Sequence, residues 1–137
     1  MERGGDVRGL VCFSDGAGRY DWLCRWLRPG FRHCWLAVNT EAGWILVDPR
    51  AHWLEVEWLA RPDFDLAAFY RSEGVAVVPV EIVEPPRRGY PVFLWTCVET
   101  VKRALGIRAW WCWTPYQLWR LLDGEAVRTG LVPRADQ

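Results

Sequence analysis

The stretch Pro91-Val-Phe-Leu-Trp-Thr-Cys-Val-Glu-Thr-Val-Lys-Arg-Ala-Leu-Gly106 predicts a loop that leads into a helix. Thr96 followed three residues later by Glu99 is a capping box, in which two side chains satisfy unpaired backbone amides at a helix start. Gly106 predicts the end of the helix, because glycine readily adopts the left-handed conformation common at helix C-termini. Cys97 is therefore expected to be the first helical residue.

A thiol at the first helical position meets the positive end of the helix dipole and unpaired N–H groups. Both favour the thiolate, which is the nucleophilic form of cysteine. The alternative is that Cys97 packs as a small apolar residue, because it shares one helical stripe with Val101, Ala104 and Leu105. The choice between these interpretations depends on a partner elsewhere in the chain.

Length and composition predict a single globular domain over residues 1–137, with a core from about 7 to 123 and an irregular tail over 124–137. The formal net charge is zero, so no electrostatic attraction to nucleic acid is expected. No apolar run is long enough to span a membrane, and the N-terminus shows no signal peptide. We therefore expect a protein that is cytoplasmic when made.

The five cysteines have irregular spacing and no C-x-x-C pair, which argues against a disulfide framework and against a metal site. No cofactor is expected. A reducing compartment fits this pattern best. Only two histidines, His33 and His52, can supply an imidazole.

Eleven tryptophans are many for this length. They would suit an aromatic groove that binds a glycan or a peptide. The alternative, which we favour, is that they fill the core and a protein interface, where tryptophan is enriched.

Hydrophobic periodicity and turn signals predict five strands and four helices. The strands are expected at 7–14, 31–38, 43–48, 51–59 and 75–83, and the helices at 19–27, 63–71, 97–105 and 115–122. Asp63 is the expected N-cap of the second helix, and Pro79 predicts an edge position or a bulge for the last strand. The order indicates an α+β fold, in which helices pack against a small, mostly antiparallel sheet.

Strands 31–38 and 43–48 predict a hairpin with a four-residue loop, in which Val38 faces Gly43. His33 then lies directly opposite Asp48, and facing side chains share one side of a sheet. A register shift of one residue would turn the two side chains to opposite faces. The hairpin thus predicts an imidazole and a carboxylate in contact.

A cysteine nucleophile needs a nearby base and a third group that orients the base. Cys97, His33 and Asp48 are the candidates for nucleophile, general base and orienting residue. Alternatively, His33 bonds Asp48 only for stability, or Asp48 before Pro49 only begins a turn. His52 is a rival base, but no carboxylate is placed opposite it.

A strand bearing histidine, a next strand with a polar residue and a later helix that begins with cysteine resemble the circularly permuted NlpC/P60 class of papain-like proteins. Phe31–Val38 precedes Thr96–Val101 here, which is the permuted order. The segment from Thr96 to Ile107 also resembles small phage and prophage proteins. Many members have glycine two residues after the histidine, where this chain has Trp35.

The resemblance implies a papain-like cysteine hydrolase with Cys97, His33 and Asp48 as its triad. It implies cleavage of an amide bond, with a peptidoglycan peptide as the expected substrate. Partners among phage tail proteins and incorporation into a virion are implied as well. Two other functions stay open: a non-catalytic structural or assembly component of a phage tail with the same fold, and an aromatic-groove binder.

Overall fold

The computed structural model describes residues 7–15, 26–50, 53–82 and 96–128. Its elements are β1 (Val7–Ser14), β2 (His33–Thr40), β3 (Gly43–Pro49), β4 (Leu54–Ala60), α2 (Leu66–Ser72), β5 (Ala76–Ile82), α3 (Cys97–Leu105) and α4 (Pro115–Arg128). The predicted α+β fold is confirmed. The helix predicted at 19–27 falls mainly on residues 16–25, which lie outside the described residues.

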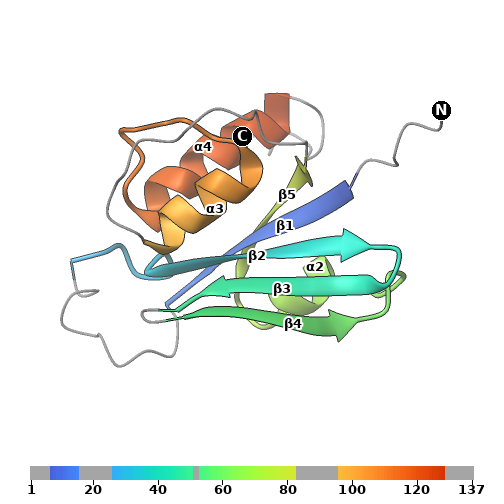
Figure 1. The fold of residues 1–137 in the computed structure, drawn as a ribbon. Coiled ribbons are helices and arrows are strands. Elements are labelled where there is room, and N and C mark those ends of the chain that lie inside the picture. Colours follow the sequence, from blue (N-terminus) through green and yellow to red (C-terminus); the bar gives the residue numbers. More distant parts are fainter. Residues whose placement is uncertain (1–6, 16–25, 51–52, 83–95, 129–137) are drawn as a thin grey trace.

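The five strands form one antiparallel sheet in the order β4-β3-β2-β1-β5 (Figure 1). β1 and β2 lie near the middle, and β4 and β5 form the two edges. The edge position predicted for Pro79 is confirmed, because β5 pairs only with β1 in the described sheet. Proline lacks an N–H for the sheet, so an edge is where a strand tolerates it.

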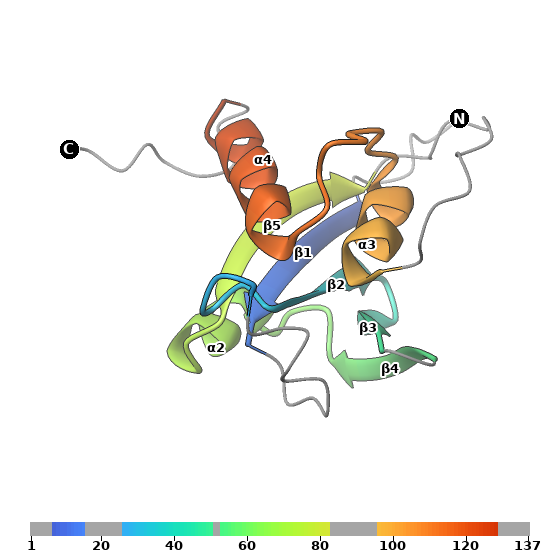
Figure 2. The same ribbon diagram turned by 90° about the vertical axis from the view of Figure 1, so that its left-hand side faces the viewer.

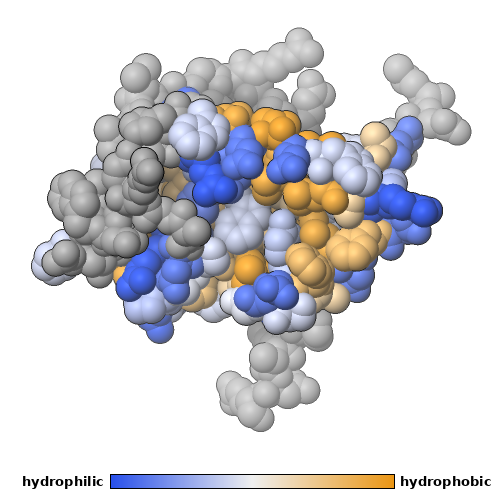
Figure 3. Space-filling view, turned by 90° about the horizontal axis from the view of Figure 1, so that it is seen from below, coloured by the Kyte–Doolittle hydropathy of each residue, from blue (hydrophilic) through white to orange (hydrophobic). Residues whose placement is uncertain are grey.

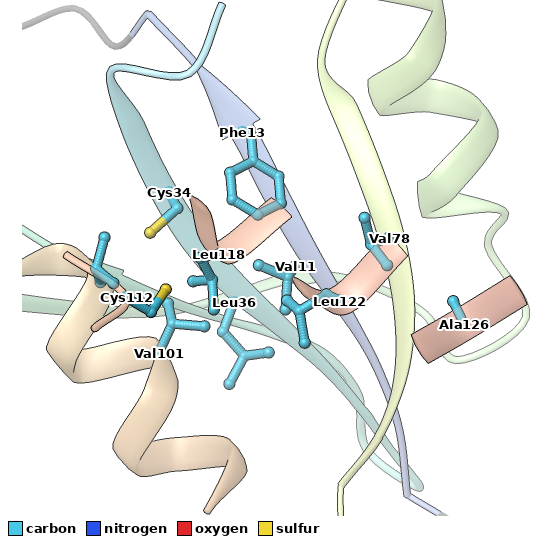
Figure 4. Packing of buried hydrophobic residues seen from close by; sticks show 11 residues of the cluster. Val11, Phe13, Cys34, Leu36, Val78, Val101, Cys112, Leu118, Leu122 and Ala126 are labelled. Carbon is cyan, nitrogen blue, oxygen red and sulfur yellow. The ribbon is translucent and has the colours of Figure 1, made fainter. Parts of the chain in front are cut away.

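The sheet separates two hydrophobic clusters, because side chains alternate along each strand. On one face, Val11 and Phe13 of β1 pack with residues of α3 and α4. On the other face, Leu10 and Cys12 pack with Leu66 of α2. The two views of the ribbon show α3 and α4 on one side of the sheet and α2 on the other (Figure 2). The first cluster is the larger and supports the start of α3 (Figure 4).

The hairpin of β2 and β3 has a two-residue turn, and the predicted four-residue loop is wrong. Thr40 pairs with Gly43, so the strands continue up to the turn at Glu41 and Ala42. The φ of Gly43 is 134°, and a Cβ there would lie 2.4 Å from the carbonyl oxygen of Ala60. This position thus admits glycine alone, which helps to fix the register.

Helix α2 begins two residues later than the sequence predicts. Its N-cap is Asp65, whose Oδ1 accepts a hydrogen bond from the Ala68 N–H at 2.9 Å, and not Asp63. Asp63 instead forms an ion pair with Arg61 at the surface. The later start places Leu66 in the cluster on this face of the sheet.

Helix α4 continues to Arg128, so the prediction of an irregular tail from 124 is wrong for residues 124–128. Its start is a reciprocal capping box: Thr114 Oγ1 accepts from the Gln117 N–H, and Gln117 Oε1 accepts from the Thr114 N–H. Gly124 is tolerated inside the helix because the stripe that includes Leu118 and Ala126 stays buried against the core.

The only lysine of the chain, Lys102, is almost completely buried. Its Nζ donates to the carbonyl oxygens of Ala109 and Cys112, each at 2.9 Å, and forms an ion pair with Glu99 at 2.6 Å. A buried ammonium is tolerated only when it is paired and hydrogen-bonded. Lys102 therefore ties the segment between α3 and α4 to α3.

Most of the described tryptophans lie at the surface, so the part of the prediction that placed them in the core is wrong, and the predicted interface stays a prediction. Trp44 alone among the described tryptophans is buried. Six are exposed: Trp26, Trp53, Trp58, Trp110, Trp111 and Trp113. On the edge strand β4, Leu54 and Val56 are exposed on the same side as Trp58, and the view from below shows hydrophobic residues among hydrophilic ones (Figure 3).

Among the described residues, no helix is both long and apolar enough to cross a membrane.

We expect Gly43→Ala to lower the free energy of unfolding by about 2–4 kcal/mol, because backbone strain and steric overlap add. Gly74→Ala is the matched control: its φ is 79°, but an added Cβ meets no atom within 4 Å. The control should cost about 1–2 kcal/mol, from strain alone. Urea denaturation measures both, and equal losses would contradict the steric role of Gly43.

Candidate active site

Helix α3 presents Cys97 as its first residue, as the sequence predicts. The N-cap Thr96 has extended backbone angles, and its Oγ1 accepts a hydrogen bond from the Glu99 N–H at 3.2 Å. Gly106 ends the helix in the left-handed conformation with φ 70°. The Cys97 side chain is partly exposed, and the next residue, Val98, anchors this end of the helix in the core.

His33 and Asp48 are in direct contact. The Nε2 atom of His33 lies 2.6 Å from Oδ1 of Asp48, whose side chain is only 9% exposed. An ionised carboxylate can only accept hydrogen bonds, so Nε2–H is the donor. Nδ1 is then the ring nitrogen left for a second partner.

The contact forms in a different register from the one predicted. Leu36 pairs with Val47, so paired residue numbers add up to 83 rather than 81. If the same register continues, Trp35 lies opposite Asp48, and His33 is its diagonal neighbour. A shift of two residues preserves the face of the sheet, and diagonal neighbours remain within reach of long side chains.

Two further side chains restrain this pair. Arg50 Nη2 lies 3.3 Å from Oδ2 of Asp48, and Arg50 Nε lies 3.0 Å from Oε2 of Glu55. The Asp48 carboxylate is therefore held at both oxygens. The indole of Trp35 stacks on the His33 ring, with 5.9 Å between the centroids. Together these contacts limit rotation of the imidazole.

The Cys97 sulfur meets β2 at the start of the strand. The Cys34 thiol, the His33 ring and the Cys34 backbone N–H are the groups there that act on its pKa. The Cys34 thiol is the strongest influence and stabilises the thiolate, burial opposes it, and the His33 contacts add to the stabilisation. The balance lowers the pKa of Cys97 to about 5.

The pKa of His33 moves the other way. Burial alone would lower it, but hydrogen bonds and charge interactions with Asp48 and Cys97 outweigh burial and raise the pKa to about 9. Between about pH 5 and pH 9, Cys97 and His33 are therefore a thiolate and an imidazolium. Protons leave such a pair in two steps that belong to both groups together.

The other described cysteines are protonated at neutral pH. Burial raises the pKa of Cys12 and of Cys34, and raises that of Cys112 to about 11. Each of these three side chains is fully buried. Cys97 is thus the reactive thiol among the described cysteines.

A pocket of about 250 Å³ opens beside His33 and Asp48. Two aromatic residues, Trp35 and Tyr70, and the Arg50 side chain contribute to its lining, which is completed by Ser14 and Leu46. The ring of Tyr70 meets that of Trp35 edge-on, with 5.7 Å between the centroids. The pocket has both apolar and charged walls, as small-ligand sites commonly do.

Within the described part of the chain, no three histidine, cysteine or acidic side chains gather in a way that would hold a metal ion.

The three residues proposed from the sequence lie together at one end of β2. Sequence reasoning missed Cys34 as a neighbour of Cys97, although alternation along a strand turns the adjacent residues His33 and Cys34 to opposite faces of the sheet. It also missed the ion pair of Arg50 with Asp48, which could be predicted only from the correct register of the strands. The rival base His52 lies outside the described residues.

No protein-family model, curated protein or solved structure matches the chain.

We expect Asp48→Asn to lower the pKa of His33 from about 9 towards its ordinary value of 6.5, because the variant removes the carboxylate charge. The matched control is Glu55→Gln, which removes a carboxylate on the far side of Arg50. NMR titration of the imidazole resonances measures both variants. An unchanged His33 pKa in Asp48→Asn would contradict the assigned pairing.

Proposed function

We propose that the protein is a cysteine hydrolase that cleaves an amide bond, with Cys97 as nucleophile, His33 as general acid and base, and Asp48 as the orienting residue. The observation that carries the proposal is that His33, whose ring is bonded to the Asp48 carboxylate, and Cys97 at the start of α3 shift each other's pKa. Nucleophilic catalysis by cysteine requires this order of three groups.

In the first step, the Cys97 thiolate attacks the carbonyl carbon of the substrate and forms a carbon–sulfur bond. Negative charge moves to the carbonyl oxygen. The backbone N–H of Cys97 is a natural donor to this oxyanion, because the first N–H groups of a helix have no partner within it. The positive end of the α3 dipole stabilises the same charge.

In the second step, the tetrahedral intermediate collapses and the carbon–nitrogen bond breaks. The His33 imidazolium donates its proton to the leaving nitrogen, so an amine departs and a thioester remains on Cys97. Neutral His33 then takes a proton from water, whose oxygen attacks the thioester. The thiolate leaves and the acid product is released, which restores the starting ion pair.

The substrate class follows from the resemblance to permuted NlpC/P60 proteins, which implies that the substrate is a peptide of peptidoglycan. Two features of the molecule support this architecture: an antiparallel sheet flanked by helices, and a histidine strand that precedes the cysteine helix in the chain. The pocket beside His33 offers aromatic walls and the Arg50 guanidinium to a substrate chain. The guanidinium is already paired with both Asp48 and Glu55, so it offers a substrate hydrogen-bond donors rather than an unpaired positive charge.

The second candidate is a non-catalytic component of a phage tail that uses the same fold. The exposed apolar side of β4 favours this role, because edge strands with apolar side chains are suited to pairing with another chain. Trp110 and Trp113 add exposed aromatic surface elsewhere. Catalysis and assembly into a particle are compatible.

The reactivity of Cys97 gives the first test of the enzyme. We expect iodoacetamide to alkylate Cys97 at pH 6, well below the range in which an ordinary thiol reacts, because its pKa is about 5. The rate should rise as pH passes through about 5. In His33→Ala the onset should move to higher pH, and a wild-type rate no faster than that of a model thiol would remove the basis for the nucleophile.

The second test is turnover. Purified peptidoglycan peptides are incubated with the enzyme, and new amino groups and cleaved fragments are followed by mass spectrometry. Cys97→Ala should abolish cleavage, and His33→Gln should slow it by about 10²–10⁴-fold. His52→Gln is the control and should keep the wild-type rate.

The pH profile separates a catalytic pair from a structural one. The wild-type rate should rise through about pH 5 and fall through about pH 9, because the reaction needs thiolate and imidazolium together. An inert wild type whose Cys97→Ser variant still enters phage particles would instead support the structural candidate.

A further inference from the structure

We propose that Cys34 is a resolving thiol for Cys97: a hydroperoxide oxidises Cys97, and the product is captured as a reversible Cys34–Cys97 disulfide. This reaction is separate from amide hydrolysis and does not depend on it. It assigns a function to a buried thiol that the hydrolytic mechanism leaves without a chemical step.

The position of Cys34 carries the proposal. Alternation along β2 turns Cys34 to the face covered by α3, while His33 turns to the other face. Figure 4 shows the Cys34 side chain on this face, among buried residues that include Cys112 and Val101 of α3. Cys97 packs against the same cluster, and each of the two thiols shifts the pKa of the other.

The two sulfurs differ in access. Cys34 is 0% exposed, whereas Cys97 is partly exposed at the start of its helix. A peroxide in solution therefore reaches Cys97 first. This division into an accessible reactive thiol and an enclosed partner is typical of cysteines that are oxidised reversibly.

The chemistry balances without any further reactant. The Cys97 thiolate attacks the outer oxygen of the hydroperoxide, the oxygen–oxygen bond breaks, and Cys97 becomes a sulfenic acid. The alkoxide that leaves takes the proton of His33 and departs as an alcohol. The Cys34 thiol then attacks the Cys97 sulfur, its proton joins the leaving hydroxide, and water is released.

The other buried cysteines are poorer partners. Cys12 faces α2, on the opposite side of the sheet from α3. Cys112 belongs to the α3-side cluster, but its carbonyl is held by Lys102, and its thiol, unlike that of Cys34, is not among the groups that shift the Cys97 pKa. Cys34 is thus the thiol already in place.

The consequence is protection of the nucleophile. While the disulfide exists, Cys97 cannot attack a substrate, and it cannot be oxidised further to the irreversible sulfinic acid. Reduction by a dithiol restores both thiols. The proposed enzyme would then lose activity under peroxide and regain it on reduction.

The experiment uses the full-length protein with hydrogen peroxide as the oxidant. After treatment, free thiols are blocked with N-ethylmaleimide, and the number of adducts on the unfolded chain should fall from five to three. Trypsin places every cysteine in a different peptide, with Cys34 in 33–50, Cys97 in 89–102 and Cys112 in 109–120. We expect a cross-linked pair of the first two peptides, which dithiothreitol separates.

Cys34→Ser is the decisive variant, because a hydroxyl keeps a hydrogen-bond donor but cannot form the bridge. Its Cys97 should accumulate at least about tenfold more sulfinic acid than the wild type at equal peroxide exposure. Cys112→Ser is the matched control in the same cluster and should still form the 34–97 bridge. A wild type that shows only sulfenic or sulfinic Cys97, or a bridge to Cys112, would overturn the proposal whether or not the protein hydrolyses amides.

Discussion

The docking of the first turn of α3 on the first residues of β2 is the constraint on which the site depends. At this point the strand offers three groups to one sulfur: the His33 ring, the Cys34 thiol and the Cys34 backbone N–H. The larger hydrophobic cluster holds the helix against the strand through Val98 and Val101. If this packing were lost, the pKa of the sulfur would rise towards its ordinary value, because the Cys34 and His33 groups that lower it belong to β2.

Much of this arrangement can be read from local sequence. Thr96 and Gly106 mark the ends of α3, because capping chemistry acts over a few residues and overrides weak propensities. The hairpin also shows its strands clearly. The register of the hairpin is harder to predict, because the local sequence is compatible with both a four-residue and a two-residue turn. Contacts with the neighbouring strand select one of them. The packing of Gly43 against β4 makes that decision.

The His33–Asp48 contact was predicted although its register was not, since an error of two residues leaves the face of the sheet unchanged. The Cys34 contact was out of reach for another reason. Alternation along β2 turns Cys34 to the face of the sheet away from His33. Only the tertiary structure shows that α3 covers the face to which Cys34 points. Likewise, Lys102 near a helix end suggests a dipole effect, whereas its carbonyl partners lie in a segment without a sequence signature.

The order of the elements has a consequence for biosynthesis. His33 and Asp48 leave the ribosome well before Cys97, and so does β4, which fixes the register of the hairpin that pairs them. Until α3 emerges and docks, the nascent chain carries no activated sulfur, since a solvated thiol is mostly protonated at neutral pH. The order of synthesis thus delays activation: the Cys97 sulfur becomes reactive only after the residues that lower its pKa are in place.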